Sequence, residues 1–189
     1  MNKKPFSSAP YTRRISQLTI DQLNGIDQYL QALLAQNSPN LKQTHYFHGR
    51  HENIYLQQSD HADLNALMEE SLNFCADILN APADELTIGY WFNLMNPGDV
   101  TTMHRHDDFA ELISGVVYLK VPENSGDLIL QPKGEDEIVL TPITGNYIYF
   151  DPATPHAVSE NQSNEHRLSI GMNIGLKADQ PAAPIYQRD

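Results

Sequence analysis

The sequence contains almost no cysteine and no long uninterrupted run of apolar residues. Cys75 is the single cysteine among 189 residues, which excludes an intramolecular disulfide framework. Because it lies on the apolar side of a predicted helix, we expect a packed thiol rather than a nucleophile. No apolar run reaches the length of a membrane-spanning helix, and none follows the charged N-terminus as in a secretory signal. We therefore expect a cytoplasmic protein without a membrane partner.

Positive charge is also scarce. The sequence has 12 Lys and Arg residues against 24 Asp and Glu residues, which gives a net charge of −12. An electrostatic field of that sign repels phosphate backbones and anionic lipid surfaces, so we expect no nucleic-acid partner. Hydrophobic residues make up 40% and charged residues 19% of the chain, as in ordinary globular proteins. The length fits one domain, residues 1–189, with a sizeable core.

The first part of the domain, residues 1–84, is predicted to be mainly helical. Thr19 is a candidate N-cap, with Gln22 as its capping-box partner, and an apolar stripe follows at helical spacing. A second amphipathic helix begins near Ser59 or Asp60 and ends before Pro82. Between the two helices, residues 42–58 are expected to form a strand or an ordered loop, whose role the sequence does not indicate.

The pattern changes to strands in residues 85–176, and residues 177–189 are expected to form a tail. Short runs rich in β-branched and aromatic residues alternate with Gly, Pro and Asn turns. The predicted strands are Leu86–Met95, Leu112–Val121, Asp127–Gln131, Glu137–Leu140, Asn146–Phe150 and Arg167–Leu176. Two helices followed by many strands indicate an α+β fold in which the helices brace a β-sandwich or barrel.

Histidine and carboxylate side chains precede the strand Leu112–Val121. His106 and Asp108 are two residues apart, so an extended backbone points both side chains to one side. His156 follows the strand Asn146–Phe150 and is the candidate for a second histidine. Two histidines and one carboxylate form the facial triad that binds non-haem Fe(II). Each residue alone is a weak signal, and their shared position beside strands strengthens it.

An arginine begins the last apolar strand. Arg167 and Ser169 are two residues apart and therefore share a face of that strand. A guanidinium that faces a core needs an anion, binds a carboxylate with two parallel hydrogen bonds, and can be assisted by a neighbouring hydroxyl. The alternative is a surface arginine at a strand end.

From Trp91 to Asn173 the sequence resembles the Fe(II)/2-oxoglutarate-dependent oxygenases, in particular a family of small bacterial and phage oxygenases. The features that carry the resemblance are Trp91-Phe92-Asn93, Pro97-Gly98, the histidine pair, Ser114-Gly115-Val116-Val117-Tyr118-Leu119, Pro122, Gly126-Asp127-Leu128, Gly145, Phe150, His156, Arg167-x-Ser169 and Asn173. They span a little under half of the chain. The resemblance implies a double-stranded β-helix, the jelly-roll barrel that cupins share, which agrees with the predicted strands.

The resemblance also implies roles for individual residues. His106, Asp108 and His156 would bind Fe(II). Arg167 would pair with the distal carboxylate of 2-oxoglutarate, assisted by Ser169 and the hydroxyl of Tyr118. The implied enzyme is a dioxygenase that consumes O2 and 2-oxoglutarate, hydroxylates its substrate and releases succinate and CO2. No catalytic residue beyond the metal ligands is implied.

The substrate and the oligomeric state are not indicated by the sequence. The acidic charge favours a small molecule, an amino acid or a protein side chain as the substrate. An exposed barrel edge often pairs with another copy, so a homodimer is an open expectation.

The register of the front ligand pair stays open. Counting back from Ser114 places the pair on His106 and Asp108, whereas counting forward from Gly98 places it on His104 and His106. We prefer the first register because strand register beyond the site is less elastic than the loop before it. His104 is therefore the alternative ligand.

A metal-binding cupin, either an enzyme or a non-catalytic binder of small molecules, is the second hypothesis. The spacing of Gly98, His104, His106 and Glu111 fits the first cupin motif, with His156 as a further ligand. The second cupin motif fits poorly in spacing, and this hypothesis gives no reason for an arginine and a serine at the start of the last strand.

Overall fold

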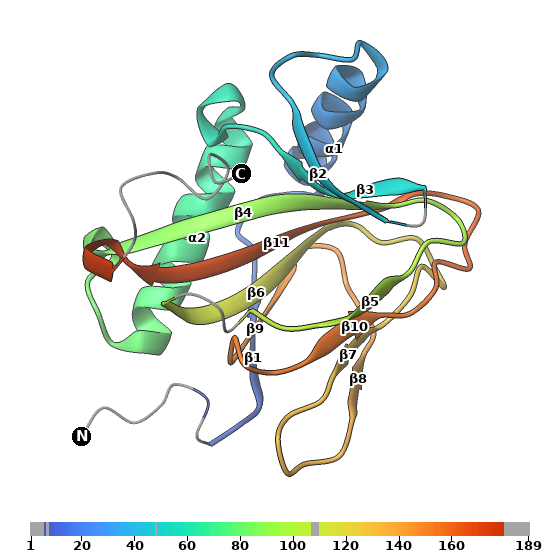
Figure 1. Cartoon of the computed structure of the whole chain (residues 1–189). Coiled ribbons are helices and arrows are strands. Elements are labelled where there is room, and N and C mark those ends of the chain that lie inside the picture. The colour runs from blue at the N-terminus through green and yellow to red at the C-terminus, as the bar shows by residue number, and fades with distance from the viewer. Residues whose placement is uncertain (1–5, 7, 48, 107–109, 180–189) are drawn as a thin grey trace.

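The computed structural model describes residues 6, 8–47, 49–106 and 110–179. These residues form three layers, in which a large antiparallel sheet lies between two helices and a smaller antiparallel sheet (Figure 1). Two facing antiparallel sheets braced by helices confirm the α+β class that the sequence predicts.

The large sheet has seven strands in the order β1-β9-β6-β11-β4-β3-β2. Their bounds are β1 Tyr11–Ile15, β9 Asn146–Phe150, β6 Glu111–Lys120, β11 Arg167–Leu176, β4 Leu86–Met95, β3 Arg50–Tyr55 and β2 Lys42–Phe47. The small sheet has the order β5-β10-β7-β8, with bounds β5 Thr101–His104, β10 His156–Val158, β7 Leu128–Leu130 and β8 Ile138–Leu140. The expected tail begins with a 3₁₀ turn, η3 Lys177–Asp179, and its remainder lies outside the described residues.

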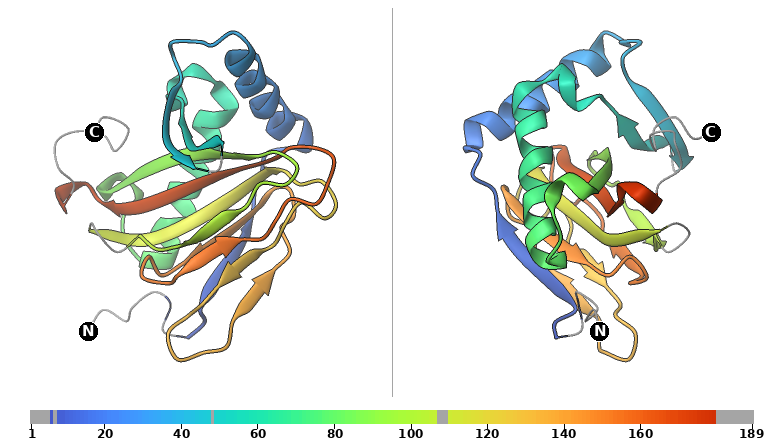
Figure 2. Two further views of the ribbon diagram at one scale, coloured as in Figure 1. Left: turned by 45° about the vertical axis from the view of Figure 1, so that its right-hand side comes forward. Right: turned by 90° about the vertical axis from the view of Figure 1, so that its left-hand side faces the viewer.

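The helices α1, Ile20–Ala35, and α2, Ala62–Leu79, cover the outer face of the large sheet (Figure 2). The predicted capping box is present, because the Gln22 backbone N–H donates to Thr19 Oγ1 and the Thr19 N–H donates to Gln22 Oε1. Helix α2 begins later than the sequence indicates, after the short 3₁₀ turn η1 at Gln58–Asp60. A second 3₁₀ turn, η2 Ala83–Glu85, leads into β4. No helix among the described residues is long and apolar enough to span a membrane.

Successive side chains of β11 point to opposite faces of the large sheet, and the two faces have different surroundings. Leu168 and Ile170 point into the core between the large sheet and the helices, while Arg167 and Ser169 line a cavity on the opposite face. Cys75 lies in the helix-side core with 0% exposure, and this burial raises the pKa of its thiol to about 12. The expectation of a packed, unreactive thiol is confirmed.

A second apolar cluster fills the space between the two sheets. Its buried members are Tyr118, Leu128, Leu130, Leu140, Ile148 and Phe150. Because these side chains come from both sheets, they hold the small sheet at a fixed distance over the large one. The small sheet carries two of the candidate metal ligands, so this cluster also positions them.

Three of the predicted strands have the bounds expected from the sequence, namely β4, β9 and β11. Residues 42–58 mainly form the antiparallel hairpin β2–β3. The short strands β5 and β10 were not expected, and they change the description of the site. Strand β5 ends at His104 and β6 begins at Glu111, so His106 lies in the connection rather than on an extended strand.

Candidate metal and cosubstrate site

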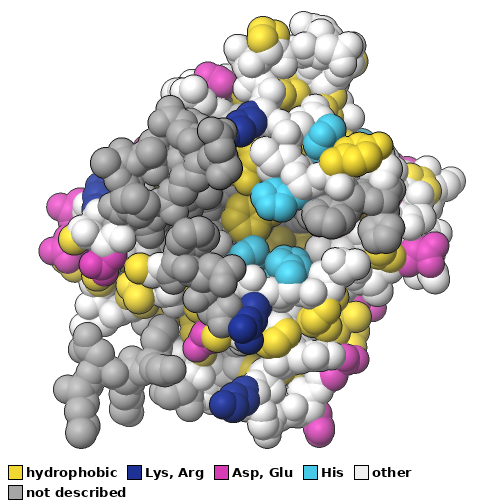
Figure 3. Space-filling view, in the orientation of Figure 1, with side chains coloured by type: hydrophobic (Ala, Val, Ile, Leu, Met, Phe, Trp, Pro, Cys, Tyr) yellow, Lys and Arg dark blue, Asp and Glu magenta, His cyan; other side chains and the backbone are white. Residues whose placement is uncertain are grey.

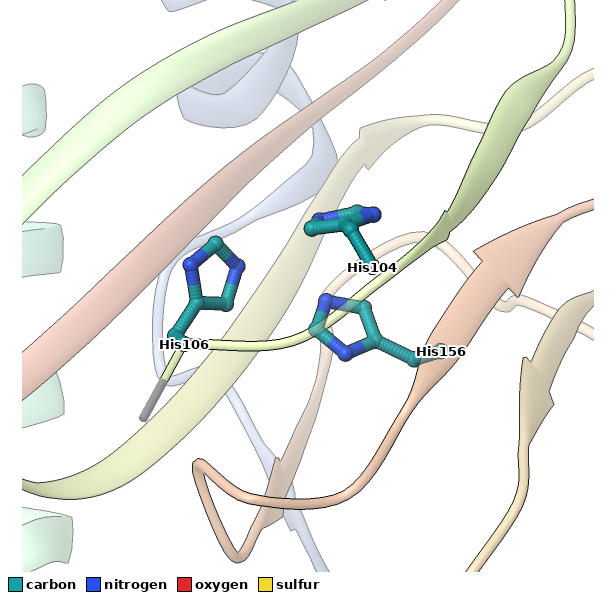
Figure 4. Close-up of side chains that lie close together, drawn as sticks. All are labelled: His104, His106 and His156. Atoms are coloured by element: carbon teal, nitrogen blue, oxygen red, sulfur yellow. The ribbon is translucent and has the colours of Figure 1, made fainter. Parts of the chain in front are cut away.

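Three histidines converge where β5 and β10 pair (Figure 4). His104 is the last residue of β5 and lies directly across from His156, the first residue of β10. His106 lies two residues beyond the end of β5, and its side chain turns back toward the other two. One ring nitrogen from each of the three residues lies within 4.8 Å of the others. The structure therefore brings together His106 and His156, as predicted, with the alternative residue His104.

Among the described residues, the three that converge are histidines, and neither carboxylate candidate, Asp108 or Glu111, is one of them. Asp108, which the preferred register assigned to the metal, lies outside the described residues. Glu111, the additional cupin ligand, is described but is not part of the histidine group found among the described residues. Contrary to the prediction from the sequence, His106 does not lie on a strand, because the pairing of β5 ends two residues earlier at His104. Cross-strand pairing with His156 favours His104 as the strand-borne ligand.

Hydrogen bonds to the backbone orient two of the imidazole rings. His104 Nδ1 donates to the carbonyl oxygen of Thr102 at 2.8 Å, and His156 Nδ1 donates to that of Thr154 at 3.0 Å. A carbonyl can only accept, so the proton is on Nδ1 in both residues. Each Nε2 lone pair is then free for a metal, which is the usual arrangement of metal-binding histidines.

Burial keeps two of the rings neutral. Burial, and to a lesser extent the nearby His104, lowers the pKa of His156 to about 3 and that of His106 to about 4. Three imidazoles at this separation, two of which are held neutral by burial, fit a divalent transition metal, because only the neutral ring can coordinate. Figure 3 shows histidine side chains gathered around a hollow with a hydrophobic floor.

Arg167 is buried in the same cavity, with 1% of its surface exposed. Its Nη1 donates to the carbonyl oxygens of Gly126 at 2.8 Å and Ser125 at 3.3 Å, while its Nε has no partner among the described residues. Burial lowers the pKa of Arg167, but a guanidinium remains charged in proteins. No carboxylate in the described part of the chain forms an ion pair with it. Burying a cation without an anion costs free energy, so an anion that entered the cavity would stabilise Arg167.

Tyr118 and Ser169 lie beside Arg167. The Arg167 Cζ atom is 5.2 Å from the centre of the Tyr118 ring, and the Tyr118 hydroxyl is buried without a partner. Burial raises the pKa of Tyr118 to about 12, so the hydroxyl stays protonated and can donate. Ser169 pairs across strands with Tyr118 on one side and Asn93 on the other. The three residues predicted to hold a cosubstrate therefore occupy one place.

One small cavity, about 60 Å³ in volume, joins the two groups of residues. It is lined by the three histidines at one part and by Arg167, Ser169 and Tyr118 at another. A larger surface groove of about 540 Å³ runs past Glu123 and Asp127 but contains none of these residues. The small cavity is therefore the chemically relevant one, because it holds both the metal donors and the unpaired cation.

Two residues of this cavity had no assigned role in the sequence. Trp91 packs against Gly171, and its ring centre is 5.4 Å from that of His106. Asn93 has a buried amide oxygen without a partner. Both lie on β4, two residues apart and facing the cavity, directly across from alternate residues of β11. The alternation of residues along β4 predicts that Trp91 and Asn93 lie on the same face of that strand. It does not predict that β4 pairs with β11.

The structure is similar to those of several solved oxygenases. One is a prolyl-4-hydroxylase from Pseudomonas putida, with 18% identity, a TM-score of 0.67 and coverage of 89% of this chain and 94% of that chain. A second is SnoK, a non-haem α-ketoglutarate-dependent carbocyclase from nogalamycin biosynthesis, with 13% identity, a TM-score of 0.69 and coverage of 95% and 90%. A third is a prolyl hydroxylase from Trichoplax adhaerens in complex with a peptide fragment of hypoxia inducible factor, with 14% identity, a TM-score of 0.68 and coverage of 92% and 87%.

No protein-family model matches the chain, and no curated protein matches it in sequence. At the low identities of the structural matches, the likeness establishes the fold. The chain has the double-stranded β-helix fold seen in Fe(II)/2-oxoglutarate oxygenases, and this confirms the fold implied by the sequence resemblance.

Proposed function

We propose that the protein is an Fe(II)- and 2-oxoglutarate-dependent dioxygenase that hydroxylates its substrate and releases succinate and CO2. The observation that carries this proposal is the presence, in one cavity, of three convergent histidines and a buried arginine without a carboxylate partner. The solved structures with this fold that carry such activities in their names support it. A metal-binding cupin accounts for the histidines but leaves the buried guanidinium unexplained.

The metal would be held by His104, His106 and His156, with His106 in the place that a carboxylate occupies in the usual facial triad. The buried, neutral rings of His106 and His156 and the Nδ1–H bonds of His104 and His156 to backbone carbonyls support this assignment. Asp108 remains the competing candidate from the sequence. Bound Fe(II) would supply the activation of O2 that organic side chains cannot perform. The contribution of the chain is to fix three donors on one side and leave the other positions open.

The cosubstrate would be held by Arg167, Ser169 and Tyr118. The guanidinium is fixed by the carbonyls of the loop before β7, so its remaining N–H groups are available to a carboxylate. The Tyr118 hydroxyl, protonated at neutral pH, would donate to the same carboxylate. These bonds would satisfy polar groups that are otherwise buried without partners, which favours binding of an anion of matching length over water.

For the substrate, we propose a small molecule or an amino-acid or protein side chain. The fold is shared by an enzyme of antibiotic biosynthesis and by a prolyl hydroxylase solved with a peptide, and both substrate classes are therefore compatible with it. A cytoplasmic location and a homodimer remain part of this proposal.

Anaerobic titration of the metal-free protein tests the function. With Fe(II) and 2-oxoglutarate together, a weak visible charge-transfer band is expected, and neither component alone should produce it. In Arg167→Ala, 2-oxoglutarate affinity should fall about thirtyfold or more, because a buried charge pair is lost, while Fe(II) affinity stays the same. Arg14→Ala removes a half-buried arginine on β1 that does not line the cavity, and it serves as the matched control. A well-folded protein that shows no band with both components would refute the proposal.

A further inference from the structure

Asn93 is a polar residue of the cavity to which neither the sequence resemblance nor the preceding assignment gives a role. It lies on β4 and faces the cavity that contains Arg167 and the histidines. Its amide oxygen is buried and has no hydrogen-bond partner in the described part of the chain. A buried amide oxygen left in this state costs free energy unless a ligand completes it.

The position of Asn93 relates it to the cosubstrate residues. Asn93 is the direct cross-strand partner of Ser169, which in turn is the direct partner of Tyr118 on the other side. Directly opposed side chains on one face of a sheet have Cβ atoms about 5 Å apart. Asn93, Ser169 and Tyr118 thus form one polar row across β4, β11 and β6, and Arg167 lies two residues from Ser169 on the same face of β11.

Another asparagine on the same face of the sheet has a side-chain amide with a hydrogen-bond partner. Asn173, also on β11, accepts a hydrogen bond from Ser114 Oγ at 2.8 Å, so its orientation is fixed by the protein itself. Asn93 has no such neighbour, because the opposing residue Ser169 does not bond to it. The difference indicates that the amide of Asn93 is left for a molecule inside the cavity.

We propose that Asn93 is a cosubstrate-contacting residue whose amide N–H donates to a carboxylate held in the cavity. This inference rests on the proposed function and deepens it. A carboxylate accepts only, so it needs the amide nitrogen rather than the oxygen, and half a turn about the terminal side-chain bond exchanges the two atoms. The ligand then receives donors from Arg167, Tyr118 and Asn93, which come from three adjacent strands. No proton or electron is transferred in this contact.

The test measures 2-oxoglutarate and metal affinities separately. Binding of 2-oxoglutarate is followed by the charge-transfer band at saturating Fe(II), without O2. Binding of Co(II) is followed by quenching of Trp91, the single tryptophan of the chain, whose ring centre is 5.4 Å from that of His106. In Asn93→Ala, 2-oxoglutarate affinity should fall roughly ten- to hundredfold, as expected for a lost hydrogen bond to a charged group, while Co(II) affinity is unchanged.

Three further variants make the result decisive. Asn93→Asp places a like charge beside the carboxylate and should weaken 2-oxoglutarate binding more than Asn93→Ala. Asn93→Ser provides a smaller polar side chain if the alanine variant folds poorly. Asn173→Ala, which removes the amide already bonded to Ser114, is the control and should leave 2-oxoglutarate affinity unchanged.

Each failure has its own signature. If Asn93→Ala binds 2-oxoglutarate like the wild type while Arg167→Ala binds it weakly, the proposed function stands and the role of Asn93 is wrong. Equal losses of Co(II) and 2-oxoglutarate affinity in the Asn93 variants would also overturn it, because they indicate a structural role. A wild-type protein that gives no charge-transfer band removes both proposals.

Discussion

Replacing Gly171 by alanine should disturb the metal site through Trp91. A Cβ atom at this position would lie 2.7 to 2.8 Å from three atoms of the indole. Carbon atoms in contact are about 3.5 to 4.0 Å apart, so the ring must retreat by about 1 Å. Such overpacking costs about 1–3 kcal/mol. For a protein of this length, the loss corresponds to a fall in Tm of roughly 2–12 °C.

The indole is also the natural reporter of this change. Trp91 is the single tryptophan and lines the cavity, so the tryptophan fluorescence of the protein reports on the cavity alone. In Gly171→Ala we expect a shifted emission maximum and weaker quenching by Co(II), because the ring moves relative to His106. Thermal denaturation and anaerobic fluorescence titration measure the two effects.

Two other glycines supply matched controls. A Cβ at Gly115 would lie 2.6 Å from the ring of Tyr149, on the helix side of the sheet, so Gly115→Ala should lower Tm without shifting Trp91 emission. A Cβ at Gly25, inside α1, would meet nothing, so Gly25→Ala should stabilise the protein by about 0.5–1 kcal/mol. If Gly171→Ala retained both the wild-type Tm and the wild-type emission, the described packing of Trp91 on β11 would be wrong.

Three further predictions concern the ligands and their support. His104→Ala should lose Co(II) binding, as measured by Trp91 quenching, whereas Asp108→Ala should retain it; the opposite result would restore the sequence-based register. In the metal-free protein, unfolded histidines gain protons near pH 6.5, but folded His106 and His156 resist protonation down to about pH 4 and about pH 3. Urea unfolding at a series of pH values should therefore show the free energy of unfolding falling by about a few kcal/mol as the pH drops from 6.5 toward 4. A free energy of unfolding that does not change over this range would contradict the burial of these rings. Arg50 donates to the carbonyl oxygen of Val100 at 2.9 Å and to Thr101 Oγ1 at 3.2 Å, and pairs with Asp99. Arg50→Met should cost roughly 3 kcal/mol and weaken Co(II) binding, since Thr101 begins the strand that carries His104, and unchanged Co(II) affinity would show that β5 does not depend on this anchor.

The long elements of this fold could be predicted because their sequence periods are strong. Strand β11 alternates between apolar and polar side chains, and α1 has both an apolar stripe and a capping box. Each signal is local, so it survives without knowledge of the partner strand. The short strands β5 and β10 have four and three residues, too few for a period to be visible.

The same limit explains what could be predicted of the site. His106, His156, Arg167 and Ser169 could be proposed from residue type and order along the chain, and Tyr118 from the resemblance. The placement of His104 across from His156 depends on the pairing of β5 with β10, which is a long-range contact. The role of Asn93 likewise depends on its register with β11. Register between distant strands is set by the packed core and cannot be read from either strand alone.

The position of β11 between β4 and β6 also limits how this protein can evolve. The strand is paired along both edges, and its two faces serve different purposes, one packing the helices and the other lining the cavity. Insertion or deletion of one residue within it would turn the arginine toward the apolar core and an isoleucine toward the cavity. Changes in length would therefore remove folding and chemistry together. New specificities should therefore arise by substitution of residues that line the cavity rather than by changes in the length of β11.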